Sequence, residues 1–78
     1  MIKDLEAKAQ KKRKIIQVNF WNSVGADEHI NLPKLEDAVK KEFNCTDDRF
    51  VKAQIELMQT ESRIIVQNRV KVWIKQPN

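Results

Sequence analysis

The chain has 78 residues, of which 41% are hydrophobic and 33% charged, with a formal net charge of +4 and one cysteine. This length predicts a single domain over residues 1–78 with one modest core, a size at which oligomerisation often adds stability. One cysteine excludes an intramolecular disulfide, and one glycine excludes a glycine-rich phosphate loop. Because no signal peptide and no long apolar run is present, we expect an intracellular, cytoplasmic protein without membrane contact.

Charge is segregated along the chain. Residues 1–14 carry six cations and two carboxylates, a net +4, and residues 49–78 repeat those numbers. Residues 15–48 carry three cations and seven carboxylates, a net −4. A basic protein of this pattern can present one face to a polyanion such as nucleic acid, although an ordinary solvated lysine surface would give the same count.

The first predicted element is a helix over residues 2–24, which Gly25 would end by adopting a left-handed conformation. A helix of this length outruns so small a core, so we expect its N-terminal half to project or to fray. The basic run Lys11–Lys14 could contact phosphates or lie beside a dimer helix. The apolar stripe of the helix, which Lys12 and Arg13 interrupt, consists of Ile2, Leu5, Ala9, Ile16 and Phe20.

Apolar residues also occur on a second side of this first helix, at Ile15, Val18 and Trp21. They could pack on the rest of the domain, or they could form a dimer contact. Small size favours the dimer, and we expect a homodimer whose candidate interface comprises these three residues and Trp73.

Two further helices are predicted with a short turn between them. Pro33 suits the first turn of one helix, and Asn44 can end it in a left-handed conformation. Thr46 or Asp47 is a suitable N-cap for the next helix, predicted over Asp47–Ser62. A very short strand near Ile30 could precede the pair. The separation is that of a helix-turn-helix.

A β-hairpin is predicted over Arg63–Lys75, where apolar residues alternate with polar ones. A three-residue loop would pair Val66 with Val70 and Ile64 with Val72, and would put the apolar residues on one face. A two-residue loop would split that face. We therefore favour the longer turn, with Asn68 in the left-handed position. In this register Trp73 points away from the apolar face.

The predicted fold is α+β and mostly helical, with three helices followed by a two-stranded hairpin. This order resembles the winged helix-turn-helix superfamily, in which the hairpin is the wing. The run Val51-x-x-x-Ile55-x-x-Met58, followed by Ser62-Arg63-Ile64, resembles the common pattern V-x-x-x-L-x-x-L-x-x-x-G-L-I of that superfamily. Ser62 departs from it, because many members have glycine there.

The resemblance implies sequence-specific binding of double-stranded DNA by a small transcriptional regulator. The third helix would enter the major groove, and the wing would touch the backbone or the minor groove. Arginine can read guanine with two hydrogen bonds, lysine can take a base or a phosphate, and a small residue can meet a thymine methyl. The residues implied are Arg49, Lys52, Ala53, Arg63, Asn68, Arg69 and Lys71.

No pattern in the chain indicates an enzyme, a metal site or a cofactor. Cys45 lies apart from any base, and His29 lacks companions at metal-ligand spacing. The alternative to DNA binding is a winged-helix adaptor that binds another protein, because a fold does not determine a function.

Overall fold

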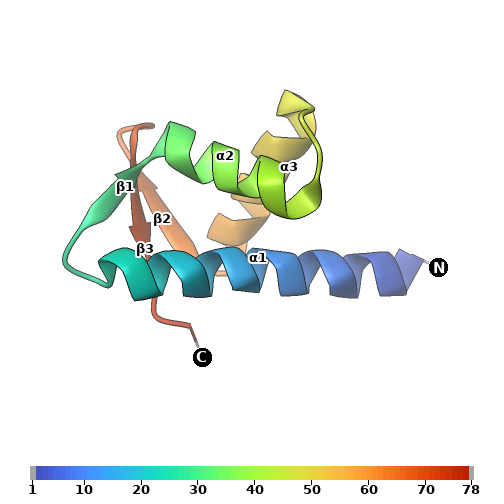
Figure 1. Ribbon diagram of the computed structural model, residues 1–78, viewed down its shortest axis with the longest axis horizontal. Helices are drawn as coiled ribbons and strands as arrows, with labels where there is room; N and C mark the ends of the chain where they lie inside the picture. Colours follow the sequence, from blue (N-terminus) through green and yellow to red (C-terminus); the bar gives the residue numbers. More distant parts are fainter. Residues whose placement is uncertain (1, 78) are drawn as a thin grey trace.

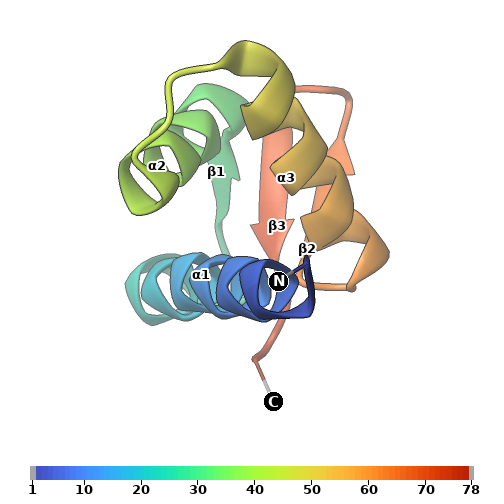
Figure 2. The ribbon, with the colours of Figure 1, turned by 90° about the vertical axis from the view of Figure 1, so that its right-hand side faces the viewer.

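The computed structural model describes residues 2–77, which form three helices and three strands. In the view of Figure 2 the helices lie in front of the strands, on one side of the sheet. The predicted α+β class, mostly helical and with a C-terminal hairpin, is confirmed. In chain order the elements are α1 (Ile2–Val24), β1 (His29–Asn31), α2 (Leu32–Phe43), α3 (Asp48–Thr60), β2 (Ile64–Gln67) and β3 (Lys71–Ile74).

Helix α1 extends beyond the other elements at its N-terminal end (Figure 1). In its second half Ile16 is buried and Phe20 packs against the core, whereas Leu5 is exposed. The helix therefore projects, as expected, and it is continuous over Ile2–Val24. The side chain of Ile2, the first residue of the predicted stripe, is outside the described part of the structure. Gly25 ends α1 with a φ of +63°, as predicted.

The helix ends follow from local residue chemistry. Asn44 ends α2 in the left-handed conformation, with a φ of 50°, as predicted. Asp47 is the N-cap of α3, where its Oδ1 accepts a hydrogen bond of 2.9 Å from the Arg49 N–H. Helix α3 ends at Thr60, two residues before the predicted end, because the chain turns through Ser62 with a φ of 59°.

The hairpin register differs from the predicted one by two residues. Val66 pairs with Val72, and Ile64 pairs with Ile74. Asn68 is left-handed as predicted, but Arg69 is left-handed too, and positive φ at both central residues is the requirement of a type I′ turn. The Val70 N–H closes this turn on the Gln67 carbonyl, at 3.2 Å.

The loop has three residues, as predicted, but it begins one residue later than predicted and includes Val70. The Val70 carbonyl accepts a hydrogen bond of 2.9 Å from the Leu32 N–H at the start of α2, and the Val70 side chain is 54% exposed. Its predicted place on the buried face was therefore wrong. Because strand side chains alternate with a period of two, the shift leaves the other four apolar residues on one face, as predicted.

Strand β1 extends the hairpin to a three-stranded antiparallel sheet of order β1-β3-β2. The short strand near Ile30 is thus confirmed, and Ile30 pairs with Val72 at the centre of the sheet. One side of the sheet and the three helices share a single hydrophobic core. Its buried members are Ile16, Ile30, Leu35, Val39, Val51, Ile55, Met58, Ile64, Val72 and Ile74.

Candidate nucleic-acid interface

The outer face of α3 carries three of the predicted site residues. Arg49, Lys52 and Ala53 are exposed, and Glu56 is exposed beside them. The opposite face of the helix is buried in the core through residues such as Val51. This amphipathic pattern holds the helix in place and leaves a row of polar side chains free to meet a ligand.

The hairpin turn carries two more predicted site residues, Asn68 and Arg69, both exposed. The hydrogen bond from Leu32 to Val70 holds this turn at the start of α2. In both Figure 1 and Figure 2 the hairpin turn and the start of α3 lie on the side of the molecule opposite α1. The two segments therefore share one side of the domain.

A groove of about 430 Å³ lies between α3 and the hairpin. It brings together Lys52 of the helix and Arg69 of the turn, which are far apart in the sequence. Glu36 and Glu56 also line the groove, so that two cations and two carboxylates share it. The remaining lining residues are Leu32, Ile55, Gln59 and Val66.

Two predicted site residues are not part of this arrangement. Lys71 alternates with the buried Val72, so it lies on the outer face of the sheet, away from the groove. Arg63 lies at the other end of the hairpin, where its Nε donates to Glu61 at 2.9 Å and its Nη1 donates to Gln17 at 3.0 Å. Its guanidinium is thus already bonded inside the protein.

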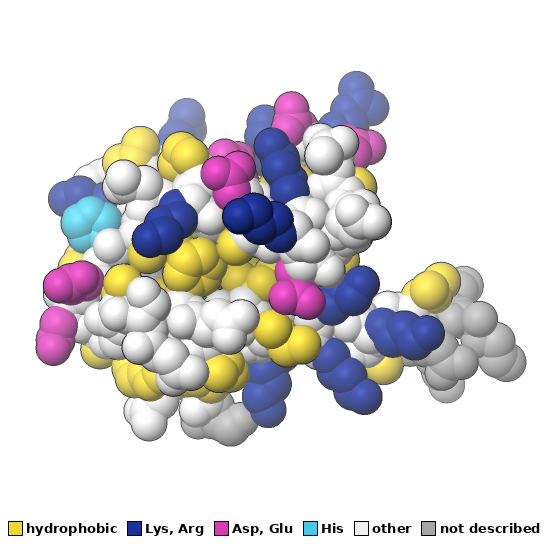
Figure 3. Space-filling model, viewed as in Figure 1, with side chains coloured by type: hydrophobic (Ala, Val, Ile, Leu, Met, Phe, Trp, Pro, Cys, Tyr) yellow, Lys and Arg dark blue, Asp and Glu magenta, His cyan; other side chains and the backbone are white. Residues whose placement is uncertain are grey.

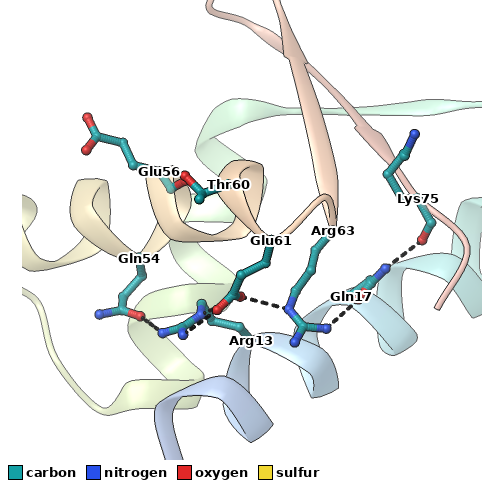
Figure 4. Close-up of polar contacts among 8 residues, drawn as sticks. All are labelled: Arg13, Gln17, Gln54, Glu56, Thr60, Glu61, Arg63 and Lys75. Carbon is teal, nitrogen blue, oxygen red and sulfur yellow. Dashed lines mark hydrogen bonds and ion pairs between the residues drawn. The ribbon is translucent and has the colours of Figure 1, made fainter. Parts of the chain in front are cut away.

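A buried polar network joins α1 to the base of the hairpin (Figure 4). Arg13 is 2% exposed and forms two parallel hydrogen bonds to the Glu61 carboxylate, at 2.9 and 2.7 Å. A third hydrogen bond, of 2.7 Å, runs from Arg13 Nη1 to Gln54 of α3. Gln17 extends the network by donating to the Lys75 carbonyl at 2.9 Å. The network positions both strands of the hairpin against α1.

Arginines surround the Glu61 carboxylate and set its protonation. The hydrogen bond from Arg13 lowers the pKa of Glu61 most, and Arg63 adds to this effect against the opposing effect of burial. The carboxylate is therefore held in its charged form, as the counter-charge of a buried guanidinium must be.

Sequence reasoning missed this network and grouped Arg13 with the run Lys11–Lys14, which could contact phosphates or lie beside a dimer helix. Arg13 takes neither role, since it is buried, whereas Lys11 and Lys14 of the same run are exposed. A signal was present, because Arg13 lies at helical spacing between the apolar residues of the α1 stripe. Gln54 likewise interrupts the apolar face of α3. A buried polar side chain needs a hydrogen-bond partner, so polar residues at core positions of both helices indicate that the two side chains bond to each other.

The candidate dimer residues are distributed over three places. Ile15, 45% exposed, and Val18 line a shallow hollow on the outer side of α1 together with two lysines. Trp21 packs against the core, and Trp73 lies on the outer face of the sheet. Figure 3 shows Lys and Arg side chains around the projecting part of α1, and hydrophobic side chains between α1 and α2.

Within residues 2–77, none of the helices combines the length and the apolar character that a membrane crossing requires. Comparison of the chain with known protein families, with curated proteins and with solved structures gave no match.

Proposed function

We propose that this protein binds double-stranded DNA as a winged helix-turn-helix, and that it acts inside the cell as a transcriptional regulator. The observation that carries the proposal is the groove in which Lys52 of α3 and Arg69 of the hairpin turn meet. A helix and a hairpin that present cations on one side of a domain can contact a groove of the duplex and its neighbouring phosphates together.

In this arrangement α3 lies in the major groove with its exposed face toward the bases. Arg49 donates two hydrogen bonds to guanine O6 and N7, and Ala53 meets a thymine methyl. Glu56, whose charge repels phosphate, accepts a hydrogen bond from cytosine N4. Asp47 and Asp48 at the start of α3 also repel phosphate, so the α3 contacts favour bases over the backbone.

The hairpin turn supplies positioning contacts. Asn68 and Arg69 reach the backbone or the minor groove, and such contacts fix the orientation of the module without selecting a sequence. We leave Arg63 out of this surface because its guanidinium is bonded to Glu61 and Gln17. Lys71 reaches DNA only from the outer face of the hairpin.

A homodimer would place two such modules on one DNA site. With a two-fold axis between Ile15 and Val18 on the outer side of α1, Ile15 of one copy contacts Val18 of the second copy, and the reverse. The same axis pairs Lys14 with Asn19, so lysine does not face lysine. Sedimentation equilibrium tests this part: a dimer is expected, Val18→Asp should give a monomer, and a monomeric wild type would contradict it.

The test of DNA binding is fluorescence anisotropy with a mixed-sequence duplex at low salt. Arg49→Ala and Arg69→Ala should each weaken binding about tenfold, because each removes a charged contact. Lys8→Ala is the matched control, since Lys8 is an exposed cation on α1, across the domain from the proposed surface. No binding of the wild type, or equal loss in all three variants, would refute the proposal.

A protein-binding adaptor is the second candidate. The observation that favours it is the presence of Glu36 and Glu56 in the groove, because two carboxylates reduce its attraction for phosphate. Salt separates the two functions. Binding to DNA should weaken steeply and log-linearly with salt concentration, whereas no duplex binding at any salt concentration would favour the adaptor.

A further inference from the structure

The outer face of the sheet is open and carries the second tryptophan of the chain. The inner sheet residues are buried under the helices, whereas His29 and Ile65, which flank Trp73 on the neighbouring strands, are both exposed. Ile65 is 49% exposed. Trp73 itself is half-buried, because the His29 ring of β1 lies on one side of it and Ile65 of β2 borders it on the other. Within residues 2–77, all three helices lie on the opposite side (Figure 2).

The Trp73 indole has a defined orientation. Its Nε1–H donates a hydrogen bond of 3.1 Å to Gln67 Oε1 on the neighbouring strand. The imidazole ring of His29 lies against it, with ring centroids 5.2 Å apart and planes inclined by 53°. An oriented aromatic ring on a solvent-facing sheet is a surface on which another flat ring can stack.

Two lysines flank this ring along the chain. Lys71 begins β3 and Lys75 follows its last residue, each two residues from Trp73. The Lys75 N–H donates to the Arg63 carbonyl at 3.0 Å, which continues the pairing of the hairpin, so the alternation of side chains puts all three residues on the outer side. Neither lysine forms an ion pair within the described residues 2–77. Inside the three strands, none of the outward positions is Asp or Glu. Asp27 and Glu28 precede β1 at one edge of the sheet, and Glu61 at the base of the hairpin is bonded to Arg13 and Arg63.

We propose that this outer face, built on Trp73 and His29 between Lys71 and Lys75, is a second binding surface whose ligand is single-stranded nucleic acid. An unpaired base stacks on the indole, and the two lysines contact the phosphates on either side of it. Such a combination of aromatic rings and cations holds single strands with little sequence preference. Duplex DNA is excluded from this site, because its bases are stacked on each other and do not offer a free ring face.

This inference does not depend on the DNA-reading surface of α3, and it accounts for two residues that surface leaves out. Lys71 is directed away from the groove of Lys52 and Arg69, and Trp73 has no role in the core. A protein with both surfaces could hold a duplex on one side and an opened strand on the other.

The test uses the intrinsic fluorescence of Trp73. In a Trp21→Phe variant of the full chain, Trp73 is the remaining tryptophan, and circular dichroism checks that the fold is retained. Addition of the oligonucleotide (dT)12, which cannot form a duplex with itself, should quench the fluorescence saturably at low salt. Quenching should weaken as salt is added, because lysine–phosphate contacts release counterions.

Variants of the otherwise wild-type chain then locate the site, with binding measured by anisotropy of labelled (dT)12. Trp73→Ala should lose about tenfold in affinity, whereas Trp73→Phe should retain most of it, because phenylalanine still stacks. The double variant Lys71→Gln/Lys75→Gln should also weaken binding. Its matched control is Lys8→Gln/Lys41→Gln, which removes the same charge from exposed positions on α1 and α2.

Three results would overturn the inference. The first is absence of quenching by (dT)12 at low salt, and the second is equal loss of affinity in the two double-lysine variants. The third is a wild-type dimer that Trp73→Ala dissociates while (dT)12 has no effect, which would assign this face to a second copy of the chain. Loss of duplex binding alone would refute the function proposed for α3 and leave this inference standing.

Discussion

The two ends of the β-hairpin use cationic side chains in opposite ways. At the base, Arg63 and the adjoining Arg13 are bonded to the Glu61 carboxylate. At the tip, Asn68 and Arg69 are exposed beside the groove of α3. The difference teaches that a basic residue has a role in stability where a carboxylate neutralises it, and is available to a ligand where it is left exposed.

The largest effect is expected at Arg13. Arg13→Ala removes three charged hydrogen bonds from a largely buried site, leaving Glu61 with Arg63 alone and the Gln54 amide oxygen without its partner, which should cost about 3 kcal/mol or more of the free energy of unfolding. Urea denaturation followed by circular dichroism measures it. Lys8→Ala, at an exposed position on the same helix, is the control and should change stability by less than about 0.5 kcal/mol. Similar losses in both variants would contradict the structural role of Arg13.

Glu61→Gln should destabilise the protein by about 2 kcal/mol, because it removes the charged acceptor of two arginines. It should also change the response to acid. The pKa of Glu61 is lower in the folded chain than its ordinary value of 4.5, so the unfolded chain takes up the proton first. The stabilisation is therefore complete above that value and is lost as the pH falls through the lower folded pKa.

Denaturation curves at a series of acidic pH values test this sign. The free energy of unfolding of the wild type should fall on acidification below about pH 4.5, and that of Glu61→Gln should fall less. If both proteins lose the same amount of stability, the carboxylate of Glu61 is not the titrating group.

Arg63→Ala and Arg69→Ala should have opposite consequences. Loss of Arg63 should lower stability by about 1.5 kcal/mol, since it removes a charged hydrogen bond at the hairpin base, and should leave duplex affinity unchanged. Loss of Arg69 should weaken duplex binding about tenfold and leave stability within about 0.5 kcal/mol of wild type. Urea denaturation measures the stability of the two variants, and fluorescence anisotropy measures their affinity for duplex DNA. Weaker DNA binding by Arg63→Ala would show that Arg63 belongs to the binding surface.

The smallest effect is expected at Ser62, where the chain enters the hairpin with a φ of 59°. The left-handed conformation costs a non-glycine residue about 1 to 2 kcal/mol of steric energy. Glycine has no such cost, but it loses more backbone entropy on folding. Ser62→Gly should therefore raise the free energy of unfolding by about 0.5 kcal/mol. Ser62→Ala keeps the steric conflict and should bring no gain, and equal stability of these two variants would count against the explanation.

The sequence was sufficient to predict features that depend on local chemistry. Asn44 and Gly25 ended their helices in left-handed conformations, and Asp47, one of the two residues expected as the N-cap, capped α3. The apolar faces of the helices and of the hairpin followed from their periodicities. Ser62 also fits the winged-helix pattern better than its identity suggested, because its positive φ is the conformation that glycine favours.

The features that escaped prediction depend on contacts between distant residues. A shift of two residues in the hairpin register leaves every paired side chain on the same face and removes only Val70 from it, so alternation could not exclude it, and the bond from Leu32 to Val70 belongs to the tertiary structure. The burial of Arg13 likewise required a carboxylate from the end of α3 and an amide from its middle. Of the predicted site residues, only Lys52 and Arg69 line the groove. Strand alternation places Lys71 on the outer face of the sheet, which the predicted pattern of the hairpin did not connect with the position of α3.

The most direct test of the proposed reading surface is the dependence of duplex affinity on salt concentration. For wild type we expect a linear plot of log K against log salt, with a slope of about −3, corresponding to three or four neutralised phosphates. Arg69→Ala should make the slope shallower by about 1, and Arg63→Ala should leave it unchanged. A flat plot for wild type, or an equal change of slope in the two variants, would contradict the division between the base and the tip of the hairpin.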